Sequence, residues 1–275
     1  MEYVLALGAS LLWGSADFMG GNLSRRLHPV VVTFVSQAFA LALVVVAAAV
    51  FAGYRAPGAY LWWGVAAGLV GAGSLAAFYR ALATGTMGVV APIAAAGVAV
   101  PVIVGLVSGE RPGPLRLAGI VGVVVGIILA SGPELREAMQ RRRAVLLAMI
   151  AAVGFGTVYV CIAKGAETSV AMTLIAQRSS GVALMGLALL ISRRLPVAGR
   201  RDLPVLAAVG AMDVGANGAF GLASTMGALA ITATLSSLYP IVTAVLARIV
   251  LEQRMRRIQL IGVVCVMAGV VLLTI

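Results

Sequence analysis

The chain has 275 residues, of which 62% are hydrophobic and 11% charged, and its mean hydropathy is +1.09. These values exclude a soluble domain, whose surface needs more charged side chains, and predict an integral membrane protein. The net charge of +11 does not indicate nucleic-acid binding, because the basic residues lie between apolar runs and form no groove interleaved with aromatic side chains.

The sequence divides at charged, proline-containing and glycine-containing breaks into ten apolar segments. Each has the length of about 17 to 25 residues that a helix needs to cross the hydrocarbon of a bilayer. The first segment lacks the basic region of a signal peptide, so we interpret it as a retained span. We expect an all-α integral membrane protein with ten transmembrane helices, over residues 3–21, 29–52, 60–84, 86–107, 115–132, 144–164, 170–191, 203–226, 229–250 and 257–274.

The first expected helix contains a carboxylate within the stretch LLWGSADFMGG, residues 11–21. An ionisable group is costly to bury inside a membrane helix, which makes Asp17 a candidate for function. Trp13 lies four residues before it on the same helix face, so both side chains are expected to face the interior of the bundle. The sequence leaves open whether Asp17 meets a proton, a substrate amine or only an arginine.

The third and fourth segments combine a charged residue with features that shape the backbone. Gly64 and Gly68 have the GxxxG spacing that favours close packing of helices. Arg80 lies near one end of its helix, where it either takes a role in a cavity or reaches the lipid headgroups. Pro92 and Pro101 each remove a backbone donor and are expected to kink the fourth helix.

The two halves of the chain resemble each other at a shift of 142 residues. Residues 61–85 then align with 203–227 with 8 identities in 25 positions, and Trp13 aligns with Phe155. Because five helices are an odd number, the second half enters the membrane from the opposite side, and such inverted repeats surround one central site in many carriers. We predict a first five-helix repeat over residues 1–132, a connecting loop over 133–143 and a second repeat over 144–275.

Polar groups within the helices gather in the second half. Arg178 lies too deep in its helix to reach either surface easily, so it needs a partner, and Asp213 and Asn217 on the next helix lie at comparable depth. Such a pair either fastens the two helices or takes part in substrate binding or coupling. Asp213 aligns with Gly71 in the first half, and Asn217 aligns with Leu75. The predicted fold is therefore pseudo-symmetric, whereas its chemistry is not.

The ninth segment carries polar side chains on one helix face, at Thr232, Ser236, Tyr239 and Thr243. Pro240 removes a backbone donor beside Tyr239 and is expected to kink this helix and to free a carbonyl group. The stripe indicates either one wall of a polar pathway or hydroxyl groups that only bond the carbonyls one turn before them.

No pattern in the sequence indicates an enzyme. Cys161 and Cys265 lie in apolar segments and His28 is the single histidine, so we expect no disulfide framework, metal site or nucleophile–base pair. We predict no cofactor and no bound metal.

The loops differ in charge between the two faces of the expected bundle. Arginines gather in the odd-numbered loops, whereas the even-numbered loops hold only Arg55, Arg111, Arg116 and Lys164. The positive-inside rule therefore predicts that both termini lie outside the cell.

Four stretches carry a family resemblance: LLWGSADFMGG, AFYRALATGTMGVVAPIAAAG, VSGERPGPLRLAGIVGVVVGIIL and TLSSLYPIVTAVLARIVLEQRMRRIQLIGVVCVMAGVVLL. They resemble the ten-helix EamA-type members of the drug/metabolite transporter superfamily, and the resemblance covers essentially the whole chain. It implies a carrier that exports or exchanges small metabolites such as amino acids, with a cavity lined by helices three, four, eight and nine with help from one and six. It also implies termini inside the cell, opposite to the orientation that the charge pattern predicts.

From these features we predict a multi-pass protein of the cell membrane that works as a secondary-active transporter by alternating access, since the chain has no ATP-binding motif. Its expected partners are a small-molecule substrate, the lipid bilayer and protons as a candidate coupling ion, but not nucleic acid; no oligomeric state is predicted. The alternatives are a carrier of sugars or nucleotide sugars and a non-transporting scaffold or helper subunit. The candidate cavity-lining residues are Trp13, Asp17, Tyr79, Tyr159, Asp213, Asn217, Ser236 and Tyr239, with Arg178 and Arg80 as charge-balancing residues.

Overall fold

The computed structural model describes residues 1–52, 58–85, 87–130, 142–193, 198–251 and 257–274, and all regular structure among them is helical. This confirms the predicted all-α class. The connecting loop expected over 133–143 lies outside the described residues as far as residue 141, and Arg142 already belongs to a helix. The helices are α1 (Glu2–Leu23), α2 (Pro29–Ala47) with the π-helical turn η1 (Ala48–Ala52), α3 (Ala59–Thr84), α4 (Met87–Ala95), the 3₁₀ turn η2 (Ala96–Val98), α5 (Ala99–Val107), α6 (Pro114–Ala130), α8 (Arg142–Ala166), α9 (Val170–Ile191), α10 (Leu203–Ser224), α11 (Leu229–Ser236), α12 (Tyr239–Leu251) and α13 (Arg257–Thr274).

Seven helices in the described part of the chain are long and apolar enough to cross a membrane. They run over Glu2–Leu23, Pro29–Val50, Ala59–Thr84, Arg143–Ala166, Val170–Ile191, Leu203–Ser224 and Leu229–Val250. Two further apolar helices, Ile93–Val107 and Pro114–Gly126, are shorter. Each of the ten expected segments contains helix. Within the residues that the structure describes, seven helices reach the length and composition of a span, so the count of ten stays a prediction.

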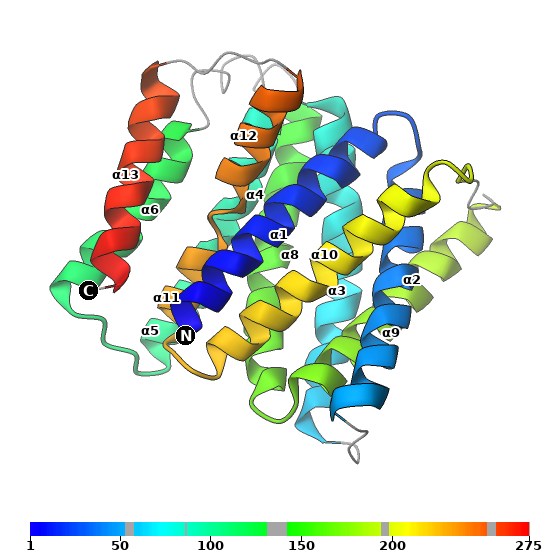
Figure 1. Cartoon of the computed structure of the whole chain (residues 1–275), viewed down its shortest axis with the longest axis horizontal. Coiled ribbons are helices and arrows are strands. Elements are labelled where there is room, and N and C mark those ends of the chain that lie inside the picture. The colour runs from blue at the N-terminus through cyan, green and yellow to red at the C-terminus, as the bar shows by residue number, and fades with distance from the viewer. Residues whose placement is uncertain (53–57, 86, 131–141, 194–197, 252–256, 275) are drawn as a thin grey trace.

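Two of the expected helices are interrupted midway along the bundle (Figure 1). The fourth segment is divided into α4 and α5 by η2, which lies between Pro92 and Pro101. The ninth is divided into α11 and α12 directly before Tyr239 and Pro240. Because proline has no backbone N–H, the helical hydrogen-bond ladder cannot continue unbroken through these positions.

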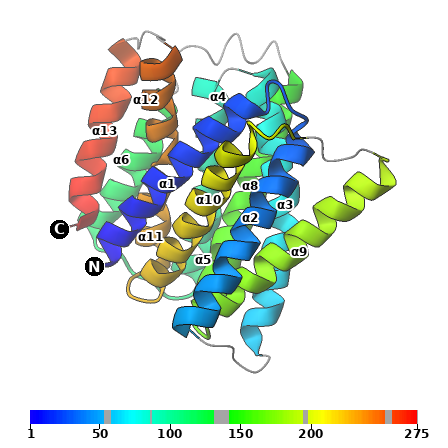
Figure 2. The same cartoon turned by 45° about the vertical axis from the view of Figure 1, so that its right-hand side comes forward.

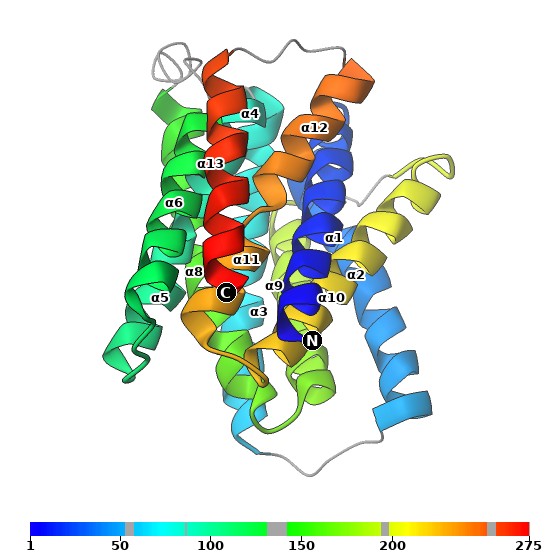
Figure 3. The ribbon, with the colours of Figure 1, turned by 60° about the vertical axis from the view of Figure 1, so that its left-hand side comes forward.

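The two halves of the chain are interleaved. α1 packs mainly against α10, and α3 packs against α8 and α9, so the most extensive contacts join helices from different halves (Figures 1 and 2). α6 and α13 form a further pair of this kind, side by side along one edge of the bundle (Figure 3). The centre of the bundle is therefore an interface between the halves.

Gly64 and Gly68 bring α3 close to α9, as their spacing predicts. A Cβ atom at Gly64 would lie 2.6 Å from the Thr173 carbonyl oxygen, and one at Gly68 would overlap the Gln177 carbonyl oxygen. Both obstacles are backbone atoms that cannot move aside, so these positions require glycine. The close approach holds this turn of α9 against α3 and keeps the next residue, Arg178, inside the bundle, where it is 4% exposed.

Candidate functional site

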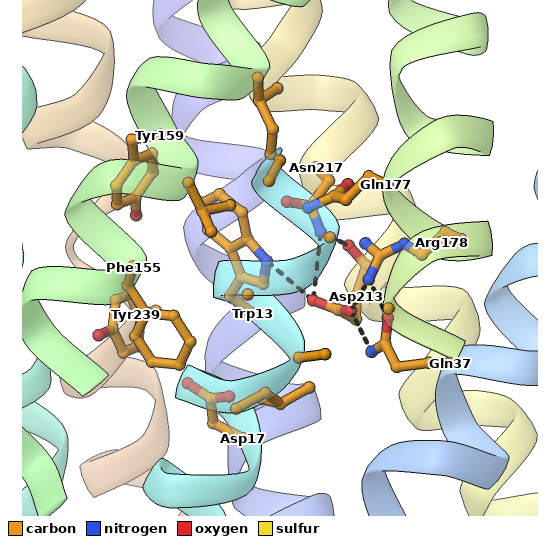
Figure 4. Close-up of a pocket in the computed structure, with 18 residues that line it drawn as sticks. Trp13, Asp17, Gln37, Phe155, Tyr159, Gln177, Arg178, Asp213, Asn217 and Tyr239 are labelled. Atoms are coloured by element: carbon orange, nitrogen blue, oxygen red, sulfur yellow. Dashed lines mark hydrogen bonds and ion pairs between the residues drawn. The ribbon is translucent and has the colours of Figure 1, made fainter. Parts of the chain in front are cut away.

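A cavity lies at the centre of the bundle (Figure 4), lined by residues of α1, α2, α3, α8, α9, α10 and α12. The empty space at this place, its open mouth included, is about 700 Å³. Segments two and seven line the cavity in addition to the expected ones. Segment four contributes none of the lining residues that the structure describes, because α4 packs behind α8 and α12.

Equivalent positions of the two halves line the cavity together. Four pairs of lining residues are separated by the predicted shift of 142 positions: Trp13 and Phe155, Asp17 and Tyr159, Gly71 and Asp213, and Leu75 and Asn217. In each of the two pairs that contain a carboxylate, the equivalent position holds an uncharged residue. The cavity is therefore pseudo-symmetric in position and asymmetric in charge.

The carboxylate of Asp213 is fully hydrogen-bonded (Figure 4). Its Oδ1 accepts from Trp13 Nε1 at 3.2 Å and from Asn217 Nδ2 at 3.3 Å. Its Oδ2 accepts from Gln37 Nε2 at 2.8 Å and from Arg178 Nη1 at 2.7 Å. A carboxylate offers about four lone-pair positions, so Asp213 has no unused acceptor. The expected pair of Arg178 and Asp213 is confirmed, and it lies in a network that joins α1, α2, α9 and α10.

Arg178 is the buried cation of this network, and it uses only part of its guanidinium group. Nη1 donates to Gln37 Oε1 as well as to Asp213. Nε and Nη2 are buried without a hydrogen-bond partner in the described residues, and so is the side-chain oxygen of Gln177 beside it. Its charge is thus balanced while two of its three nitrogen donors stay unused.

Asp17 lines the same cavity but stands apart from the network. Its side chain lies one helical turn from Trp13 on α1 and is 7% exposed (Figure 4). Among the residues with described side chains, none forms a hydrogen bond or ion pair with its carboxylate. The arginine partner that the sequence left open for Asp17 is therefore not found there, and its oxygens face the cavity.

Aromatic side chains form one wall of the cavity. The ring of Tyr159 packs edge-on against Trp13 and against Phe220, with 5.3 Å and 4.7 Å between the ring centroids. Trp13 also contacts Phe220 at 6.1 Å between ring centroids. The two contacts of Tyr159 have the edge-to-face arrangement that aromatic rings prefer. They hold the indole of Trp13 so that its N–H points at Asp213.

Three of the predicted site residues are not among those that line the cavity. Tyr79 is buried with its hydroxyl against Gly20 of α1. The Ser236 hydroxyl donates to the Ala6 carbonyl at 3.3 Å and so fastens α11 to α1. Arg80 is exposed on the outer side of α3, as expected of a side chain that reaches the headgroups.

Gln37 and Gln177 line the cavity but are not among the predicted site residues. The sequence gives only a weak indication of them, because an amide side chain in an apolar helix is uncharged and so costs less to bury than an ionised group. They do occupy equivalent places, at the ends of the stretches TFVSQ and TLIAQ. A search for polar residues at equivalent places of the two repeats, within apolar helices, would have identified both glutamines.

Contacts between the halves also lie at both ends of the bundle. At the end of the bundle where the N-terminus lies, the Glu110 carboxylate accepts hydrogen bonds from the backbone N–H groups of Leu229 at 2.7 Å and Ala230 at 3.0 Å. These are the first two residues of α11. At the other end, where α1 ends and α10 begins (Figure 1), Arg26 Nη2 lies 2.7 Å from Asp202 Oδ1. Each contact joins a residue of the first half to one of the second.

Known proteins share the sequence pattern and the fold. The family model described as "EamA-like transporter family" matches the chain twice, over residues 1–132 and 142–275. Among solved structures, 29 chains match. One of these, described as "Crystal structure of protein", has a TM-score of 0.76 and 19% sequence identity over 98% of this chain and 96% of its own. At that identity the likeness concerns the fold alone. No curated protein matches the sequence.

Proposed function

We propose, from the premise that this chain belongs to the EamA-like transporter family, that it is a secondary-active carrier of small metabolites. The family lies within the drug/metabolite transporter superfamily, so the chain is a multi-pass membrane transporter of that type. In the proposal it exports or exchanges amino acids or related compounds by alternating access in the cell membrane, and it catalyses no reaction.

The observation that carries the proposal is the central cavity to which both repeats contribute equivalent residues. Alternating access needs one site that two related half-pathways reach in turn, and inverted repeats supply these. The four pairs separated by 142 positions are what such a site requires. We therefore keep ten spans as the proposed topology, with five-helix repeats over 1–132 and 144–275.

The two carboxylates of the cavity take different roles in this mechanism. Asp213 has four donors, so it anchors Arg178 and fixes the shape of the site. Asp17 has none in the described part of the chain, so it is the residue proposed to exchange protons or to bind a substrate amine. Ionisable groups inside membrane helices mark the proton relays of pumps and transporters.

The contacts at the two ends of the bundle support rocking of one half against the other. Glu110 holds the start of α11, and Arg26 holds the start of α10 through Asp202. Opening the cavity toward either end separates the halves at that end. The corresponding contact then has to break, which makes each of them part of the proposed cycle.

Counterflow in proteoliposomes tests the proposal. Vesicles that contain the purified protein are loaded with a panel of amino acids, sugars or nucleotide sugars, and uptake of the labelled compound is measured; a parallel screen records thermal stabilisation by each compound. The proposal expects saturable counterflow of an amino acid or related metabolite. Sugar flux without amino-acid counterflow would favour the sugar carrier, and neither flux nor stabilisation would favour a scaffold or helper subunit.

A further inference from the structure

Arg178 presents an unused binding edge to the centre of the bundle. Nη1 makes the contacts with Gln37 and Asp213, whereas Nε and Nη2 have no hydrogen-bond partner in the described residues. Figure 4 shows Nη1 on the side of Gln37 and Asp213 and the rest of the guanidinium on the side of Gln177 and Asn217. The N–H bonds of Nε and Nη2 run parallel along one edge of the planar group, at the spacing of the two oxygens of a carboxylate.

The two nitrogen atoms of this edge are buried inside the bundle. Arg178 is 4% exposed, and buried donors of a charged group cost free energy when they stay unpaired, most of all in a membrane interior. The neighbouring Gln177 oxygen is also buried and unpaired. Two donors and one acceptor therefore lack partners at one place in the cavity wall.

Asp213 does not compete for this edge, since its four acceptor positions are already filled. It holds the guanidinium by Nη1 alone, which fixes the plane of the group and leaves the opposite edge free. A bidentate arginine–carboxylate contact has strict geometry, and the network around Asp213 supplies that orientation before any ligand arrives.

We propose that the Nε–Nη2 edge of Arg178 binds the carboxylate of the transported substrate. The inference rests on the proposed transport function and narrows its substrates to carboxylates. Asp213 already balances the charge of Arg178, so a bound carboxylate brings one further negative charge into the cavity. A substrate that carries an ammonium group beside its carboxylate compensates this charge within the same molecule. The aromatic wall of Trp13 and Tyr159 receives the apolar part of such a molecule.

Matched acids and amides test this inference on the wild-type protein. L-Leucine and L-alanine are compared with L-leucinamide and L-alaninamide, which keep size and ammonium group but lose the carboxylate, by thermal stabilisation and by counterflow. Losing a bidentate charged contact is expected to weaken binding by about tenfold or more. Equal binding of acids and amides would overturn the inference, because Arg178 would then only fasten α9 to α10.

The variant Arg178→Lys provides the second arm. Lysine keeps the positive charge beside Asp213 but has no Nε–Nη2 edge, so the preference for acid over amide should fall below about threefold. Arg248→Lys, an exposed residue of α12, is the matched control and should keep the wild-type preference. A preference that survives in Arg178→Lys overturns the inference, and the wild-type comparison remains decisive if that variant does not fold.

The two proposals fail in different ways. If the protein carries neutral or cationic solutes without preferring acids, transport stands and the carboxylate site is wrong. If no compound of the metabolite panel is carried or stabilises the protein, the transport function fails, and the carboxylate site fails with it.

Discussion

Arg178 of α9 and Asp213 of α10 form an ion pair inside the bundle, with 2.7 Å between Nη1 and Oδ2 and side-chain exposures of 5% and 13%. Without its partner, each of the two groups would be a buried and unpaired charge. Removing one partner of a buried pair costs about 3–5 kcal/mol, because the remaining charge stays buried.

We therefore expect Asp213→Asn to lower the thermal unfolding temperature of the detergent-solubilised protein strongly. Lys164→Gln is the control, because it breaks an ion pair with Glu167 in which both side chains are exposed, by 40% and 62%. An exposed pair contributes only about 0–1 kcal/mol. A loss in Asp213→Asn no larger than in Lys164→Gln would show that the buried pair does not hold α9 to α10.

Asp17→Asn should leave the fold intact, because the carboxylate has no hydrogen-bonding partner to lose in the described residues. If Asp17 exchanges protons during transport, the variant's flux should lose its dependence on pH, since an amide does not titrate in this range. Flux across a pH series, with unfolding temperature as the check on folding, measures this. Unchanged pH dependence in both Asp17→Asn and Asp213→Asn would exclude the proton-coupling role.

Glu110→Gln should weaken the contact between the first half and the start of α11. The carboxylate accepts from two backbone N–H groups there, and the amide replaces one acceptor with a donor and removes the charge that the helix N-terminus favours. We expect a loss of about 1 kcal/mol together with an altered counterflow rate. Glu167→Gln, whose residue is exposed and pairs with Lys164 three residues earlier, should change neither quantity; equal effects of the two variants would contradict the proposed role of Glu110.

Gly68→Ala should destabilise the protein, whereas Gly73→Ala on the same helix should not. The new methyl group at Gly68 would overlap the Gln177 carbonyl oxygen, but at Gly73 no atom lies within 4 Å of it. Forced overlap in a packed interior costs about 1–3 kcal/mol, and alanine in a free helical position favours the helix by up to about 1 kcal/mol over glycine. Unfolding temperatures that move the same way in both variants would argue against the close contact of α3 and α9.

Much of the cavity follows from the repeat in the sequence. Trp13, Asp17, Asn217 and Tyr239 line it as expected, and the equivalence of Trp13 with Phe155 holds in space. Tyr79 shares α3 with lining residues and Ser236 lies three residues before Tyr239, but both side chains point at α1 instead. Composition cannot separate these cases, because an aromatic ring or a hydroxyl serves equally well in a cavity wall or in a contact between helices.

By itself, the sequence determined the membrane class, the positions of the helices, the duplication and the pairing of Arg178 with Asp213. These depend on local hydropathy, on helical periodicity and on the cost of an unpaired buried charge. The tertiary structure alone decided that Asp213 is saturated while Asp17 and one edge of Arg178 are not. The donors to Asp213 come from three other helices and from as far as 200 positions away, and their meeting depends on how those helices are rotated and tilted against one another, which helical periodicity does not specify.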